Sequence, residues 1–326
     1  MRAIVRKQYG EADQLAIEQR PQPQPRPGEV LVEIRAFGLN RAEIYMRRGA
    51  WGEVAEISGI ECVGLVQADP AGRFAAGQKV AALLGGMGRG IPGSYAEYVC
   101  VPAAHVVPLR TQLSWEELAA IPESYATAWT CLHRNLALVP GRTLLIRGAS
   151  SALGQAALNI AAQLGAQVIA ATRRPERGEA LRQLGAQQVL PEEPRLSQRV
   201  RELHPRGIDA VLDLVGNSVL LDSLNMVRPD GRICLAGFLG GSEPLAGFNP
   251  MQHLPSGVQL SFFGSAFAYG TPDYPLSEVP LQAIVDHVAD GTYQAQPARV
   301  FRFEQIQEAH RLMESDLAGG KLVVRV

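Results

Sequence analysis

From about Pro122 onward, short apolar runs alternate with segments that carry helical spacing. Residues 143–147 read TLLIR and predict a strand, and the apolar residues of 152–164 predict a helix that ends at Gly165. Residues 167–171, QVIAA, predict the next strand. This alternation is typical of a parallel sheet with helices on both faces, as in a Rossmann-type doubly wound domain. We therefore predict an α/β fold class.

The alternation continues towards the C-terminus. A proline opens the expected helix at 175–184, and Gly185 follows its end. Further strands are expected at residues 209–215, 232–236, 258–263, 300–303 and 321–326, and further helices at 276–290 and 304–315.

The first 120 or so residues instead predict a β-rich region. Period-two patterns separated by Gly/Pro clusters predict strands at residues 30–36, 62–67, 78–83 and 95–101. Residues 21–27, PQPQPRP, predict an extended connector, with a polyproline ligand for a partner domain as the alternative.

The small-residue turn at 148–154, GASSALG, lies directly between a predicted strand and a predicted helix. Such a turn lets backbone N–H groups approach a diphosphate, and the helix N-terminus adds partial positive charge. The context predicts a dinucleotide site, although Ser151 replaces the middle glycine of GxGxxG. The alternative is a plain strand–helix turn with small residues for packing. The predicted cofactor-binding residues here are Gly148, Ser150, Ser151, Ala152, Leu153 and Gly154.

The end of the second strand predicts which cofactor binds. NAD sites usually place an acid there for the ribose 2′-OH, but this chain has Thr172, Arg173 and Arg174. Guanidinium groups bind phosphate through paired donors, so we predict NADPH. A solvated surface pair of arginines is the alternative. Glu176, the nearest acid, falls in the first turn of the next predicted helix and is expected to complement its dipole.

Composition excludes several function classes. The net charge of −1 leaves no basic field for nucleic acid, and no apolar run approaches the roughly 20 residues of a membrane span. The N-terminal residues MRAIVRKQYG contain no apolar h-region, so we expect no secretory signal. The four cysteines form no CxxC pair and the six histidines no ligand spacing, so we expect a cytoplasmic protein without a metal site.

Several motifs together resemble the zinc-independent quinone oxidoreductase branch of the medium-chain dehydrogenase/reductase superfamily. They occur in the family's order from the first strand to the last, which is more specific than any one motif. The motifs are GLNRAEIY at 38–45, GIECVG at 59–64, GSYAEY at 93–98, Thr127-Ala128, the turn at 148–154, Gly237-Phe238 and GKLVV at 320–324.

The resemblance implies a domain organisation and an assembly. Residues 1–121 and 269–326 would form a GroES-like catalytic domain, and the Rossmann-type NADPH-binding domain at 122–268 would be inserted between them. It also implies a homodimer in which the strand near 258–263 pairs across subunits.

The chain departs from the zinc alcohol dehydrogenases of this superfamily. Asn40 and Ile60 stand where those enzymes carry a cysteine and a histidine, and residues 83–94 lack the cysteines of their structural zinc lobe. Zinc needs about four N, S or O ligands, so we predict no metal.

Without a metal, the resemblance points to substrates that accept hydride readily, such as quinones and α,β-unsaturated carbonyls. Asn40 and Tyr45 are the predicted catalytic contacts, with packed aromatic as the alternative for Tyr45. The resemblance adds further cofactor-binding residues: Asn40, Thr127, Asn217, Gly237, Phe238 and Lys321. The alternatives for function are an enoyl-thioester or 2-alkenal reductase and a non-catalytic, crystallin-like NADPH-binding protein.

Overall fold

The computed structural model describes residues 1–326, which divide into two compact units. Unit 1 comprises Met1–Ala126, Ser265–Gly291 and Ala295–Val326, and unit 2 comprises Thr127–Gly264 and Thr292–Gln294. The sequence placed the boundaries after residues 121 and 268. In the structure the first division falls after Ala126, within helix α3 (Pro122–Thr130), which begins directly after the expected boundary.

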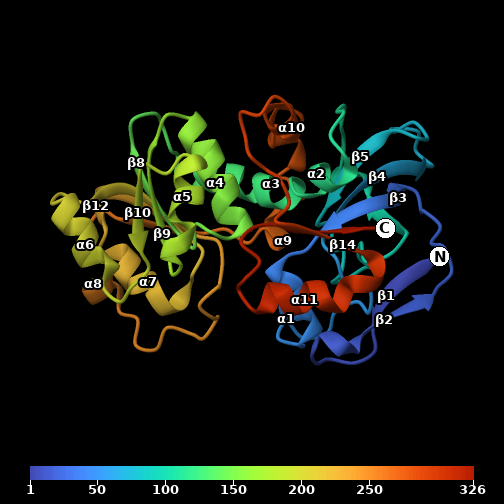
Figure 1. Ribbon diagram of the computed structural model, residues 1–326, viewed down its shortest axis with the longest axis horizontal. Helices are drawn as coiled ribbons and strands as arrows, with labels where there is room; N and C mark the ends of the chain where they lie inside the picture. The colour runs from blue at the N-terminus through green and yellow to red at the C-terminus, as the bar shows by residue number, and fades with distance from the viewer. The chain divides into compact units, whose positions relative to one another are not determined.

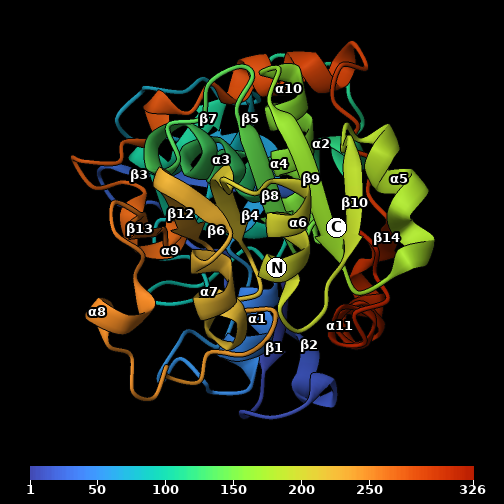
Figure 2. The same cartoon turned by 90° about the vertical axis from the view of Figure 1, so that its left-hand side faces the viewer.

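Unit 2 is built on a six-stranded parallel sheet with the order β10-β9-β8-β11-β12-β13. Chain order reverses direction between β8 and β11, which is the doubly wound arrangement that the sequence predicted. Figure 2 shows β8, β9 and β10 side by side in light green. The strands are β8 (Thr143–Arg147), β9 (Gln167–Thr172), β10 (Gln188–Pro191), β11 (Ile208–Asp213), β12 (Val227–Leu235) and β13 (Gln259–Phe262).

Helices cover this sheet because their apolar faces need burial. Helix α4 (Ala152–Gln163) packs on β8 and β9, and α7 (Asn217–Leu224) packs on β11 and β12. The strand residues Leu145, Val211 and Ile233 are fully buried beneath the helices. The remaining helical elements are the π-helix η3 (Cys131–Asn135), η4 (Pro175–Arg177), α5 (Gly178–Gln183), α6 (Leu196–Leu203) and α8 (Pro250–His253).

Unit 1 is β-rich, as expected. Its seven-stranded sheet has the order β14-β15-β3-β4-β5-β7, with β6 also paired to β3, and a separate hairpin joins β1 to β2. The strands are β1 (Arg2–Arg6), β2 (Leu15–Gln19), β3 (Glu29–Gly38), β4 (Glu61–Ala68), β5 (Lys79–Leu83), β6 (Tyr98–Pro102), β7 (Val106–Pro108), β14 (Arg299–Arg302) and β15 (Leu322–Arg325). Figure 1 colours the early strands blue and the late β14 red.

Short helices complete unit 1: α1 (Arg41–Arg47), α2 (Trp115–Ala119), α9 (Ser265–Ala268), α10 (Leu281–Ala289) and α11 (Ile306–Glu314), with 3₁₀ turns η1 (Ala12–Gln14), η2 (Ala103–His105), η5 (Leu276–Glu278) and η6 (Phe303–Gln305). No helix of the chain has both the length and the apolar character needed to cross a bilayer.

Several sequence expectations differ in detail. The helix expected over 276–290 is split into η5 and α10, because Pro280 has no backbone N–H to continue a helix across that point. The helix expected over 175–184 begins as the 3₁₀ turn η4 before α5. The strand expected over 95–101 begins only at Tyr98. Residues 21–26 form neither helix nor strand, consistent with an extended connector.

Candidate functional site

The turn after β8 is shaped by two glycines. Gly148 has φ +77°, and a Cβ there would lie 2.9 Å from Leu239 Cδ1. A Cβ at Gly154 would lie 2.6 Å from Gly148 O, so the turn and the first turn of α4 touch at backbone distance. Ser151 caps α4: its Oγ accepts from Gly154 N at 3.1 Å and donates to Gly148 O at 2.8 Å.

This turn fits a diphosphate. Ala152 and Leu153 are the first residues of α4, so their N–H groups have no acceptor within the helix. Both residues are only half-buried, as are Ser150 and Ser151. The twelve-residue helix also places its positive end at this turn. The six predicted residues of 148–154 are therefore brought together in an arrangement suited to an anionic ligand.

The residues after β9 are Thr172, Arg173 and Arg174. Thr172 is buried, and its Oγ1 accepts from Arg174 N at 3.1 Å. Arg173 is exposed, and Arg174 Nη1 lies 3.6 Å from Glu176 Oε1 in η4. Glu176 is largely exposed, and its partner is an arginine side chain. The strand end itself therefore presents cationic side chains and no carboxylate.

The remaining predicted residues of unit 2 follow other strands. Asn217 begins α7, after β11, and its Nδ2 donates to Glu243 O at 2.8 Å. Gly237 and Phe238 follow β12, and a Cβ at Gly237 would lie 2.8 Å from Leu214 O. Thr127 is buried in α3. Thus all of these except Thr127 lie at the carboxyl edge of the parallel sheet, where doubly wound folds bind ligands.

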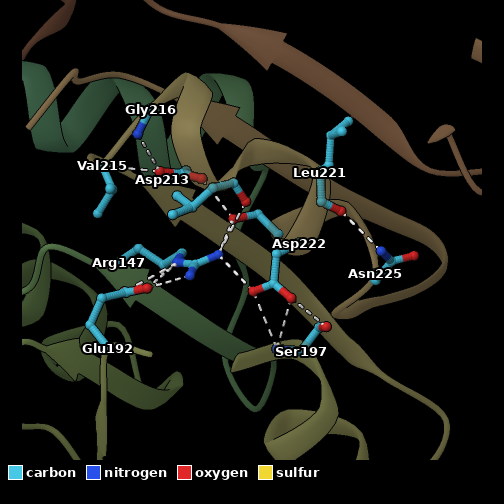
Figure 3. A network of polar contacts seen from close by, with 11 residues as sticks. Arg147, Glu192, Ser197, Asp213, Val215, Gly216, Leu221, Asp222 and Asn225 are labelled. Atoms are coloured by element: carbon cyan, nitrogen blue, oxygen red, sulfur yellow. Dashed lines mark hydrogen bonds and ion pairs between the residues drawn. The ribbon is translucent and has the colours of Figure 1, made fainter. Parts of the chain in front are cut away.

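A buried arginine beneath that edge was missed by sequence reasoning (Figure 3). Arg147 ends β8 and is 1% exposed. Its Nε donates to both Glu192 carboxylate oxygens at 3.1 Å, and the guanidinium also forms a closer ion pair with Glu192. Its Nη1 donates to Asp222 Oδ2 and to Ser223 Oγ, each at 3.0 Å. The only indication in the sequence was that a charged residue, Arg147, ends a mostly apolar strand.

Asp213, at the end of β11, extends this network towards the next loop (Figure 3). Its Oδ1 accepts from the backbone N–H groups of Val215 and Gly216, each at 2.9 Å, and its Oδ2 accepts from Ser223 Oγ at 2.6 Å. Burial raises the pKa of Asp213 despite these hydrogen bonds. The network therefore fixes the loops after β8, β10 and β11 relative to one another.

In unit 1, Asn40 precedes α1, and both polar atoms of its side-chain amide form hydrogen bonds. Nδ2 donates to Glu61 Oε1 at 2.9 Å, and Oδ1 accepts from Lys321 Nζ at 2.7 Å. Lys321 and Glu61 also form a buried ion pair. The structure thus brings together Asn40 and Lys321, two predicted site residues, through Glu61. The motif that contains Glu61 was noted in the sequence, but its contact with Asn40 was not predicted.

Beside this group lies a second buried line of polar contacts. Glu43 Oε2 accepts from Asn40 N at 2.6 Å and from Tyr95 OH at 2.9 Å, and Tyr95 OH lies 2.9 Å from His310 Nε2. Burial raises the pKa of Glu43 to about 7 and lowers that of His310 to about 3. His310 is fully buried.

Tyr45 lies on α1, one turn after Asn40, and is half-buried. Burial raises the pKa of its phenol, while the nearby Arg41 lowers it less. The ring of Trp51 lies 5.9 Å from the Tyr45 ring, centroid to centroid. Tyr45 therefore keeps its proton at neutral pH.

The chain contains no group of three or more His, Cys, Asp or Glu side chains placed to hold a metal ion. At the two positions where zinc enzymes carry ligands, Asn40 is held by Glu61 and Lys321, and Ile60 is buried.

Two family models match the chain. Residues 26–111 match the alcohol dehydrogenase GroES-like domain, and residues 152–279 match the family described as zinc-binding dehydrogenase. Together these matches cover parts of both units.

Individual relatives match nearly the whole chain. A polyketide synthase subunit of Mycobacterium tuberculosis is 28% identical over 341 residues, covering 100% of this chain, which spans only 15% of that subunit. Quinone oxidoreductase-like protein 2 of Bos taurus is 27% identical, covering 93% of this chain and 86% of that protein. A mycobacterial protein solved in complex with NADPH has a TM-score of 0.88 at 25% identity, with all of both chains covered.

Proposed function

Because this chain belongs to the quinone oxidoreductase branch of the medium-chain dehydrogenase/reductase superfamily, we propose that it reduces a quinone or related α,β-unsaturated carbonyl with NADPH. The observation that carries the proposal is the placement of Tyr45 on α1, the helix that Asn40 caps. A protonated phenol and a fixed amide, both presented by the same short helix, suit an oxygen that gains negative charge during reduction.

The reaction has a simple balance. NADPH, when bound, would supply the hydride and with it the two electrons that the conjugated substrate accepts. The Tyr45 hydroxyl supplies the proton to the resulting oxyanion, and water returns a proton to Tyr45. Asn40 orients the substrate oxygen through the Nδ2 hydrogen that Glu61 does not accept, since one Nδ2 carries two donors.

NADPH is favoured over NADH by charge. Arg173 and Arg174 follow β9, and Glu176 is the acid nearest to them in sequence. A 2′-phosphate would compete with the exposed Glu176 for Arg174, and phosphate carries more negative charge than a carboxylate. The NADPH complex of the mycobacterial relative supports the same choice.

We propose that the reaction needs no zinc. Lys321 Nζ already donates to Asn40 Oδ1, so a cation in this position would face an ammonium group. Metal analysis of the purified, active protein should find far less than one zinc per chain, and stoichiometric zinc whose removal abolishes turnover would contradict the proposal.

We further propose a cytoplasmic homodimer. All four cysteines are free thiols, which supports a reducing compartment. Strand β13 is the edge of the unit 2 sheet, and its Leu260 and Phe262 are exposed. Exposed apolar residues on an edge strand favour pairing with a second copy of the same strand.

The function is tested by following NADPH oxidation over a panel of quinones, 2-alkenals and enoyl thioesters. Turnover of quinones or simple enones supports the proposal, whereas turnover of thioesters alone would favour an enoyl-thioester reductase. NADPH binding without turnover of any class would favour a non-catalytic NADPH-binding protein.

A further inference from the structure

Arg89 lies in a loop of unit 1 whose backbone is tightly folded. Gly86 O accepts hydrogen bonds from the N–H groups of Arg89, Gly90 and Ile91, at 3.0, 2.9 and 3.1 Å. Met87 is buried beneath the loop. Arg89 O accepts from Ala55 N at 2.9 Å, so the loop is tied to the segment that follows Trp51. These hydrogen bonds fix the backbone position of Arg89.

The guanidinium group of Arg89 is held by aromatic rings. Its Cζ lies 4.3 Å from the centroid of the Phe267 ring and 5.8 Å from that of Trp51. Rings at these distances attract a cation through their π-faces and restrict its orientation. Both rings are partly exposed, Phe267 by 64% and Trp51 by 39%. Arg89 is therefore positioned by apolar surface that still contacts solvent.

Arg89 has no anionic partner. Its only side-chain hydrogen bond is a long one of 3.5 Å from Nη1 to Ala266 O, and it makes no ion pair with a carboxylate of the chain. Arg2 and Arg299 also lie over aromatic rings, but each pairs with a glutamate, Glu97 and Glu308 respectively. Arg89 thus keeps the paired N–H donors of a guanidinium available in a fixed place.

Trp51 connects this cation to the reacting group. The Trp51 ring lies within 6 Å of both the Arg89 guanidinium and the Tyr45 ring. A molecule whose carbonyl oxygen reaches Tyr45 can therefore lie across Trp51 and place a second group at Arg89. The indole face suits a planar conjugated body, and the guanidinium suits a carboxylate.

We propose that Arg89 recognises a carboxylate on the substrate, so that the preferred substrates are compact conjugated carbonyls or quinones that carry a carboxylate about one indole ring away from the reacting carbonyl. The proposal rests on the reductase function proposed above and names the substrate class of that same site. The phosphate of a carrier-bound thioester lies at the far end of a long pantetheine arm and does not match this spacing.

The test uses a series of 1,4-benzoquinones with ω-carboxyalkyl side chains of increasing length, each paired with its methyl ester. A charge-assisted hydrogen bond should give the best acid about a 10- to 100-fold higher kcat/KM than its ester, mainly through KM. Arg89→Met keeps a side chain of similar length on the rings but should remove this preference. Arg89→Lys should keep part of it, and the exposed loop variant Arg73→Met should keep all of it.

Two results would overturn the proposal: equal kcat/KM for acid and ester at every length in the unmodified protein, or an acid preference that persists in both Arg89 variants. Thermal melting checks that Arg89→Met is folded, and if it is not, the comparison of Arg89→Lys with the unmodified protein decides. Calorimetric binding of the same acid–ester pairs separates this proposal from the reductase function. Tighter binding of the acid that depends on Arg89, without any turnover, would contradict the reductase function alone, whereas equal binding would contradict the carboxylate site.

Discussion

Lys321 donates a hydrogen bond from its ammonium group to the amide oxygen of Asn40, 2.7 Å away, although 281 positions separate the two residues. Glu61 contacts both, accepting from Asn40 Nδ2 and pairing with Lys321. The Asn40 amide cannot flip without placing its NH₂ group against the ammonium group. Its orientation is therefore set by residues that need not touch the substrate.

Removing one member of this group should cost stability. Lys321→Met leaves the carboxylate of Glu61 buried without its cation, which typically costs about 3–5 kcal/mol of unfolding free energy. The double variant Lys321→Met/Glu61→Gln should recover a large part of that loss, because no buried charge is then unpaired. Urea denaturation of the single and double variants measures both effects. A double variant no more stable than Lys321→Met would contradict the ion-pair interpretation.

Tyr45→Phe should lower kcat with quinones and enones by at least about tenfold, since positioned proton donors typically contribute 10²–10⁴-fold. The variant removes the hydroxyl but keeps the ring against Trp51. NADPH affinity should be unchanged. Steady-state kinetics with NADPH titration measures both, with Tyr98→Phe on β6 as the matched control. Unchanged turnover in Tyr45→Phe would exclude the proton-donor role.

Arg173→Ala/Arg174→Ala should weaken NADPH by about 10- to 100-fold and NADH much less, because only NADPH carries the 2′-phosphate. Fluorescence titration with each nucleotide gives the two dissociation constants. Arg199→Ala, an exposed arginine of α6 in the same unit, is the control. An equal loss for both nucleotides would disprove the 2′-phosphate assignment.

Glu43 and His310 should make the free energy of unfolding depend on pH in opposite directions. The folded-state pKa of Glu43 is raised to about 7, so its contribution is present below about pH 4.5 and is lost as pH rises through 7. The folded-state pKa of His310 is lowered to about 3, so its contribution is present above about pH 6.5 and is lost as pH falls through 3. Between about pH 4.5 and 6.5 the two slopes oppose each other.

Glu43→Gln should therefore make stability rise more steeply with pH across that window than it does in the unmodified protein. Chemical denaturation at several pH values measures the slope. A Gln variant with an unaltered slope would show that Glu43 titrates normally in the folded protein.

Phe262→Glu on β13 should convert the proposed dimer to monomers, because it places a charge on an edge that would pair with a second copy. Analytical ultracentrifugation gives the mass of each form, and Phe248→Glu, at another exposed aromatic of unit 2, is the control. A monomeric unmodified protein would refute the dimer outright.

The sequence predicted the doubly wound sheet well, because β8, α4 and β9 are local patterns with apolar periods of their own. It did not predict α1, a seven-residue helix that has too few turns to show a period. It also missed Glu43, Tyr95 and Arg147 as polar hubs. Each of these is defined by partners from distant parts of the chain, and nothing in its local sequence indicates that it is buried with them.

The Arg147 network is a second example of side-chain contacts that could not be predicted from the sequence. Arg147 is adjacent to the turn that was predicted from the sequence. Its partners are Glu192, which follows β10, and Asp222, which lies in α7. The sequence predicted no functional role for either partner. Pattern reading locates the backbone that approaches a ligand. It does not locate the side chains that hold such a backbone in place.

Strand β15 lies between β14 and β3 in the unit 1 sheet. During synthesis, β6 can pair with residues 29–33 of β3, but residues 36–38 lack their partner until residues 322–325 are made. Most of unit 2 is made as one continuous stretch in between. The ribosome thus delivers a unit that can fold at once before it delivers the strand that completes the first unit. Chaperone dependence during translation should accordingly centre on the first 126 residues.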